Sequence, residues 1–82
     1  MMKLKVRALG EGMHPSEVVV GVTTRSGLEC LSVSRRALKD GSLDIGYPIT
    51  VDQQLYLVEL PRETQTGMWR VWVNEDQVIH SY

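Results

Sequence analysis

The stretch from Glu17 to Val33, EVVVGVTTRSGLECLSV, decides the fold class of this chain. Residues 18–24 are rich in β-branched side chains, which favour strands, and residues 28–33 form a second apolar segment. Between them Arg25-Ser26-Gly27 is a short turn in which the glycine can adopt a positive φ. The spacing predicts a β-hairpin of residues 18–24 and 28–33. Its first strand is either covered on both faces or bent at Gly21.

Short segments on either side continue this pattern. Residues 3–8 alternate cationic and apolar side chains, which is typical of a half-buried strand. Further strands are expected over residues 55–60 and 68–73, and Ser34 is expected to cap one short helical turn. No internal repeat is visible at a solenoid period. We therefore predict an all-β fold, or β with one short helix, as a small antiparallel barrel or rolled sheet of five to seven short strands. Residues 1–82 are predicted to form a single small β-rich domain.

Size and composition exclude several classes of protein. The chain has 82 residues, 43% of them hydrophobic, which is a globular composition and not that of a disordered or collagen-like chain. A domain of this size has a thin core and little room for a deep substrate cavity. The succession of short strands is similar to that of SH3-like and Sm-like small barrels, but no motif of either family is present. This similarity concerns the fold alone and implies no function.

The net charge of -1 conceals an uneven distribution along the chain. Residues 1–39 carry seven basic and three acidic groups, a sum of +4, whereas residues 40–82 carry two basic and seven acidic groups, a sum of -5. Of two interpretations, we favour the one in which basic and acidic strands are neighbours and pair internally. The alternative is that the two segments form separate charged surfaces for a partner.

Chemical motifs supply no candidate catalytic residue and no candidate metal ligand. His14, His80 and Cys30 do not occur at metal-ligand spacing, and the glycines form no phosphate-binding loop. Cys30 lies within an apolar segment and is interpreted as a buried small side chain rather than a reactive thiol. We expect no enzyme activity and no cofactor.

One candidate interaction surface lies in the predicted strand over residues 68–73. Alternation places Trp69 with the valines of this strand on one face and Met68, Arg70 and Trp72 on the other. If the valine face is the core, Trp72 points outward beside Arg70, a combination that is enriched in binding hot spots. If a loop covers the other face, Trp72 is a core residue. The candidate surface is therefore Met68, Arg70 and Trp72.

A second candidate is a basic patch. Lys3, Lys5 and Arg7 would share one face of the first strand, and Arg35 and Arg36 would add to it from the short helical turn. Such a patch can bind a phosphate backbone or an acidic protein surface. The alternative is a solvated strand face that blocks edge-to-edge association, with the helical segment as a simple connector.

These features predict a protein-interaction module, with a homodimer as one of its forms. The alternative is a nucleic-acid-binding small barrel that uses the basic N-terminal strand and the Arg35-Arg36 segment. The single cysteine and the absence of a secretory leader pattern favour a cytoplasmic location. No apolar run has the length of a membrane span, so a membrane partner is not expected.

Overall fold

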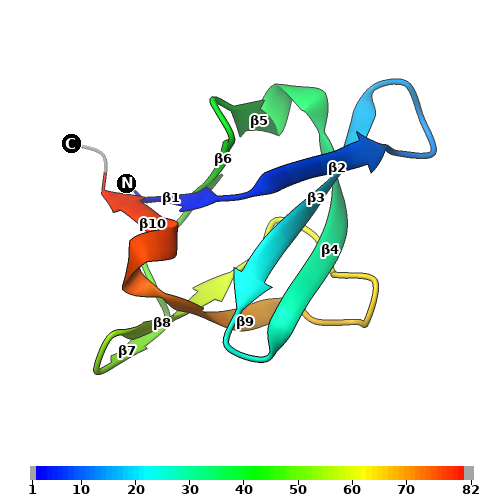
Figure 1. The fold of residues 1–82 in the computed structure, drawn as a ribbon. Helices are drawn as coiled ribbons and strands as arrows, with labels where there is room; N and C mark the ends of the chain where they lie inside the picture. Colours follow the sequence, from blue (N-terminus) through cyan, green and yellow to red (C-terminus); the bar gives the residue numbers. More distant parts are fainter. Residues whose placement is uncertain (1, 81–82) are drawn as a thin grey trace.

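Ten short strands and two 3-10 turns make up residues 2–80, the part of the chain that the computed structural model describes (Figure 1). The strands are β1 (Met2–Lys5), β2 (Arg7–Glu11), β3 (Glu17–Thr24), β4 (Gly27–Ser34), β5 (Leu38–Lys39), β6 (Ser42–Ile45), β7 (Thr50–Asp52), β8 (Leu55–Glu59), β9 (Arg70–Asn74) and β10 (Val78–His80). The 3-10 turns are η1 (Arg35–Ala37) and η2 (Glu75–Gln77). The prediction of a mostly β chain is confirmed. The predicted helical turn after Ser34 is present as η1, with the Ser34 hydroxyl accepting the N–H of Arg36, and η2 is a second such turn.

The strands form three small antiparallel sheets, ordered β10-β1-β6-β5, β2-β3-β4 and β7-β8-β9. The predicted hairpin is present as β3 and β4, which pair from Glu17 opposite Ser34 to Thr24 opposite Gly27. No closed barrel is formed by residues 2–80, so the finer prediction of a barrel is not confirmed. There are more strands than predicted because the chain bends between short segments, as at Val6 between β1 and β2.

The order of elements occurs twice along the chain. Each half of the chain has two strands, then a two-strand hairpin, a 3-10 turn and a short last strand, which we call the return strand. These elements are β1–β5 with η1 in the first half and β6–β10 with η2 in the second. We call residues 2–39 the first repeat and residues 42–80 the second repeat. The pairing registers agree as well, because Val20 opposite Leu31 in the first repeat corresponds to Val58 opposite Val71 in the second.

The two repeats are related by a pseudo-two-fold arrangement centred on the pair of Leu4 and Leu43. These leucines lie opposite each other where β1 pairs with β6. On the outer sides of this central pair, β10 places Val78 opposite Leu4, and β5 places Leu38 opposite Leu43. Each return strand thus pairs with the first strand of the other repeat. The palindromic strand order β10-β1-β6-β5 is the consequence.

This repetition of elements is compatible with the absence of a solenoid repeat from the sequence, because it follows no fixed period. Equivalent positions are separated by 38 residues from Val20 to Val58, by 39 from Leu4 to Leu43 and by 40 from Leu31 to Val71. The separation varies because the loops differ in length, and what the two repeats share is mainly a set of small apolar residues. No fixed period is therefore visible in the sequence.

Both repeats contribute to one buried apolar cluster. Its members are mostly valine and leucine: Met2, Leu4, Val18, Val20, Val22, Leu31, Val33, Leu43, Ile45, Val58, Leu60, Val71, Val73 and Val78. Alternate residues of β3 and of β9 enter this cluster, as the two-residue period of a strand requires. The other faces of the hairpins remain available for polar and aromatic side chains.

Hairpin loops hold the repeats together at the edges. The main-chain N–H of Arg25, in the β3–β4 turn, donates to the carbonyl of Trp72 on β9 at 2.8 Å. Reciprocally, the N–H of Gln65, in the β8–β9 loop, donates to the carbonyl of Cys30 on β4 at 2.8 Å. Each loop thus donates a main-chain hydrogen bond to the edge strand of the other repeat. The described residues include no helix with the length and apolar character needed to span a membrane.

Candidate functional site

The Met68–Arg70–Trp72 surface borders a hollow of about 350 Å³ between β9 and the β3–β4 turn. Val71 and Val73 of β9 are buried, as the alternation predicts, and Trp72 is half-buried on the other face of the strand. Met68 and Arg70 line the same hollow as Trp72. The structure therefore brings the three predicted residues together. We call this feature the Trp72 hollow.

Trp69 does not share the buried valine face that the alternation predicted for it. Its side chain is 53% exposed, because β9 begins only at Arg70 and Trp69 still belongs to the preceding loop. Its carbonyl accepts a hydrogen bond from the N–H of Leu60 at 2.8 Å. Together with Met68, which is 47% exposed, Trp69 adds a large apolar side chain near one end of β9.

Arg25 covers part of Trp72 from the opposite repeat. Its guanidinium carbon lies 5.5 Å from the centre of the indole ring, within the range of a cation–π contact. The turn that carries Arg25 is held by Thr24, whose hydroxyl donates to the carbonyl of Gly27 at 2.7 Å and accepts from the N–H of Ser26 at 3.1 Å. Within residues 2–80 Arg25 forms no ion pair.

A carboxylate at the edge of the hollow is held by the β8–β9 loop. Thr64 and Thr66 both donate hydroxyl hydrogen bonds to Glu29, the former at 2.8 Å. These bonds, that from Thr66 first, lower the pKa of Glu29 from its ordinary value of 4.5. Thr64 is buried, and its hydroxyl also accepts the main-chain N–H of Met68 at 3.0 Å. Glu29 and Thr64 therefore position Met68 in the hollow.

Sequence reasoning did not identify Arg25, Glu29, Thr64 or Thr66 as part of this surface. All four come from a turn, a strand end or a loop, and the Thr66–Glu29 contact joins residues 37 apart. The one local signal was Gly67 at the end of the polar loop, which has a φ of 89° and closes the Thr64 turn. That signal predicts a turn, but it does not identify the strand against which the turn packs.

The predicted basic patch is divided by the fold. Lys3 lies opposite Asp44 in the pairing of β1 with β6. Arg35 is turned toward the loop before β3, where it contacts Glu11 at 3.6 Å and donates to the carbonyl of Pro15 at 2.7 Å. Arg36 is exposed on η1. Lys5 and Arg7 line one hollow together within residues 2–80.

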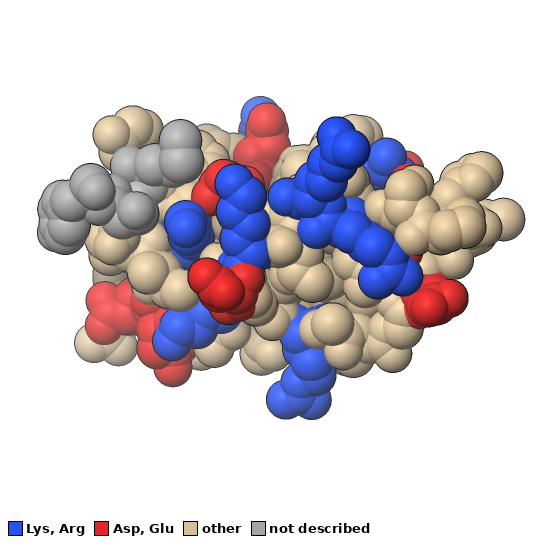
Figure 2. Space-filling model, turned by 90° about the horizontal axis from the view of Figure 1, so that it is seen from above, with Lys and Arg blue, Asp and Glu red and all other residues tan. Residues whose placement is uncertain are grey.

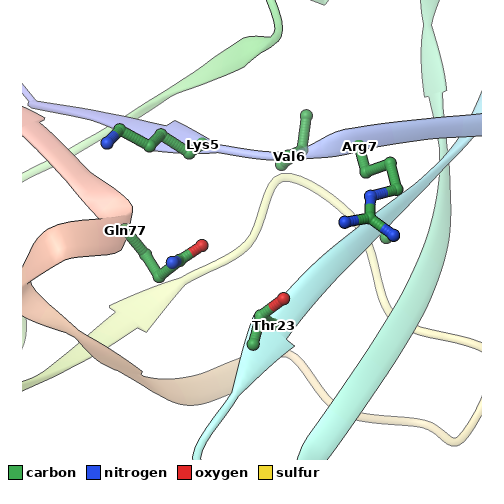
Figure 3. A pocket seen from close by; sticks show the side chains of 6 residues that line it. Lys5, Val6, Arg7, Thr23 and Gln77 are labelled. Carbon is green, nitrogen blue, oxygen red and sulfur yellow. The ribbon is translucent and has the colours of Figure 1, made fainter.

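That hollow has a volume of about 220 Å³ and lies where β1 passes into β2. It is lined by Lys5, Val6 and Arg7, together with Gly21 and Thr23 of β3 and Gln77 of η2. Figure 3 shows the guanidinium of Arg7, the hydroxyl of Thr23 and the carboxamide of Gln77 turned toward one another across it, while the Lys5 side chain runs back along β1 with its ammonium group away from Arg7. We call this feature the basic hollow.

The ion pairs do not support the favoured interpretation of the charge asymmetry. Three ion pairs occur within residues 2–80: Arg35–Glu11, Arg62–Glu17 and Arg70–Glu59. None joins a cation of residues 1–39 to a carboxylate of residues 40–82, although Lys3 and Asp44 are cross-strand neighbours. On the face shown in Figure 2, lysine and arginine side chains cross the middle, with carboxylates between and beside them. The one ion pair between the two segments within residues 2–80, Arg62–Glu17, joins a cation of the acidic segment to a carboxylate of the basic segment.

Comparison of this chain with protein-family models, with curated proteins and with solved structures gave no match.

Proposed function

We propose that this protein is a protein-interaction module that binds a segment of another protein at the Trp72 hollow. The observation that supports it most is the grouping of Met68, Arg70 and Trp72 around one hollow, with Arg25 against the indole of Trp72. Aromatic residues, methionine and arginine are the residue types enriched at protein interfaces, and tryptophan and arginine dominate their hot spots.

The hollow suits a partner segment that combines an apolar side chain with a carboxylate. Met68, Val71 and Trp72 provide apolar walls. Arg25 has no carboxylate partner within residues 2–80, and Arg70 contacts Glu59 only at an exposed site, at 3.3 Å. Glu29 also lines the hollow and stays anionic, because the two hydroxyls that donate to it stabilise its charged form. The cations at this surface are Arg25 and Arg70, and Arg25 is the one without an ion pair within residues 2–80.

The nucleic-acid alternative has weaker support. A phosphate backbone is best held by several cations along one track, but Lys3 faces Asp44 and Arg35 contacts Glu11. Stacking of bases would require exposed aromatic rings beside the remaining cations, Lys5 and Arg7, and no aromatic side chain lines their hollow within residues 2–80.

A displayed library of random peptides, selected on the immobilised protein, tests this function. We expect enrichment of peptides with a large apolar residue close to Asp or Glu. Met68→Ser and Arg25→Gln should each weaken the selected peptides at least about tenfold, which is about 1.4 kcal/mol. Met13→Ser is the matched control, because Met13 is 95% exposed and lies outside the hollow.

Two outcomes would contradict the proposal. In the first, no peptide family is enriched, or the selected peptides bind Met68→Ser as tightly as the unmodified protein. In the second, sedimentation shows a homodimer that Met68→Ser dissociates, which would identify a second copy as the occupant of the hollow.

A further inference from the structure

The basic hollow is open to a ligand on a different face of β3 from the Trp72 hollow. Thr23 lines the basic hollow and Thr24 lines the Trp72 hollow. Consecutive residues of a strand point to opposite faces, so the two hollows do not compete for one ligand. A ligand bound in one hollow therefore leaves the other hollow free.

Hydrogen-bond donors dominate the polar groups of the basic hollow. Arg7 offers up to five guanidinium N–H groups, Thr23 a hydroxyl, and Gln77 a carboxamide that can present its NH₂ group by rotation. No carboxylate lines the hollow within residues 2–80. Asp76 is the neighbouring acid, and it accepts only a long contact of 3.5 Å from the amide nitrogen of Gln77.

The two cations of this hollow, Lys5 and Arg7, have no ion-pair partner in the part of the chain that the structure describes. Arg7 is exposed on β2, and its strand position is fixed by pairing with Gly21. Gly21 has no side chain at this position, and the side chains of Leu9 and Leu28 pack closely over it.

The second repeat provides an internal comparison. By the pairing registers, Lys5 corresponds to Asp44 and Gly21 corresponds to Glu59. Asp44 and Glu59 line a hollow of about 310 Å³ in the second repeat. Two related positions of the same fold thus carry a lysine and a glycine in one repeat and two carboxylates in the other. The charge of the first hollow is therefore a property of its side chains and not of the backbone framework.

From this geometry we propose that the basic hollow binds a phosphate group, with Arg7, Thr23 and Gln77 as donors and Lys5 as a rim cation. Guanidinium groups match the geometry of phosphate oxygens and can contact two of them at once. A hydroxyl and a carboxamide opposite the guanidinium can donate to the remaining oxygens. The phosphate is either free in solution or carried as an ester by a larger molecule.

A titration of the ¹⁵N-labelled full chain with inorganic phosphate at constant ionic strength, followed by amide and Arg side-chain NMR shifts, tests this site. We expect saturable shifts at Arg7, Thr23 and Gln77, and none at Gly46 and Tyr47 in the hollow of the second repeat. A parallel titration with capped phosphoserine distinguishes the two sources. Tighter binding of the ester points to a phosphorylated partner, and equal or weaker binding points to free phosphate.

Three variants distinguish a specific phosphate site from general electrostatic attraction. Arg7→Gln should weaken phosphate binding by about tenfold or more, because it removes a charge-assisted hydrogen-bond donor. Thr23→Val should weaken it with no change in net charge. Arg36→Gln, an exposed cation of η1 outside the hollow, is the matched control and should change the affinity less than about twofold.

Two results would overturn the proposal. The first is the absence of any saturable shift in the hollow up to about 100 mM phosphate, an affinity too weak for a specific site. The second is an equal loss on Arg7→Gln and Arg36→Gln, which would show that only overall charge matters. Dispersed amide spectra and unchanged urea midpoints of all three variants would show that they remain folded.

Discussion

Arg25 and Trp72 are joined twice, once through the main chain and once through their side chains. The N–H of Arg25 donates to the carbonyl of Trp72 at 2.8 Å, and the guanidinium carbon lies 5.5 Å from the centre of the indole. The first contact positions the β3–β4 turn against the edge of β9, and the second covers part of the aromatic ring. One turn of the first repeat therefore shapes the candidate site on the second.

Replacement of Arg25 by Ala should remove the side-chain contact and keep the main-chain bond. We expect a loss of about 0.5–1 kcal/mol in the free energy of unfolding, the usual size of a cation–π contact at a partly exposed site. Urea denaturation followed by tryptophan fluorescence measures it. A double-mutant cycle with Trp72→Leu isolates the pair, and Arg25→Ala should then cost almost nothing in the Trp72→Leu background. An equal cost in both backgrounds would contradict the assigned contact.

The hydrogen bonds to Glu29 should make stability depend on acid pH. Because they lower the pKa of Glu29 in the folded state below its ordinary value of 4.5, the unfolded state binds the proton more readily. The stabilisation is present above pH 4.5 and is lost as the pH falls through the lowered folded-state pKa. Urea midpoints measured from about pH 7 to pH 3 should fall more steeply for the unmodified protein than for Glu29→Gln, and the two curves should converge in acid.

Glu63→Gln is the control for this pH effect. Glu63 is an exposed carboxylate of the same β8–β9 loop, so its removal changes the net charge equally. Its pH profile should keep the slope of the unmodified protein. If Glu63→Gln flattens the profile as much as Glu29→Gln does, the hydrogen bonds from Thr64 and Thr66 do not cause the effect.

Part of the fold could be predicted from local sequence and part could not. The β3–β4 hairpin was predictable because the valine run and the Arg25-Ser26-Gly27 turn are contiguous, and turn type and strand propensity act locally. The inward position of Val71 and Val73 follows from alternation alone. The barrel was not confirmed, because sheet closure depends on which strand edges meet across the whole chain.

Only those residues of the candidate site that lie on a single sequence segment could be predicted. Met68, Arg70 and Trp72 were found because they share one face of a single segment. Glu29 and Arg25 were missed because they reach this surface through tertiary contacts between the repeats. The surroundings of the predicted basic patch could not be foreseen either, since strand alternation places Lys3 and Lys5 on one face but does not show that Asp44 lies opposite Lys3.

The pseudo-two-fold arrangement predicts matched core substitutions. Leu4 and Leu43 are both fully buried and lie opposite each other at the centre of the arrangement. Leu4→Ala and Leu43→Ala should each lower the free energy of unfolding by about 2–5 kcal/mol, and the two costs should agree within about 1 kcal/mol. Leu28→Ala is the control, because Leu28 is 56% exposed and should cost much less. Clearly unequal costs in urea denaturation would contradict equivalent surroundings for the two leucines.

The exchange of return strands predicts that neither repeat folds alone. A peptide of residues 1–39 lacks β6, the partner of β5, and a peptide of residues 40–82 lacks β1, the partner of β10. Each peptide would also bury too little apolar surface to be stable. Near-ultraviolet circular dichroism and amide NMR dispersion should be absent from either peptide and should return in an equimolar mixture.

Charge should favour this mixed pair over pairs of identical peptides. Residues 1–39 sum to +4 and residues 40–82 to -5, so identical peptides repel each other and different peptides attract. The mixed complex should therefore weaken as salt is raised from about 0.05 to 0.5 M, because screening reduces the attraction. If either peptide folds alone, its return strand must pair with its own first strand or with that of an identical copy. That result would contradict the prediction, because the attraction between the two segments would then not be needed for their strands to pair.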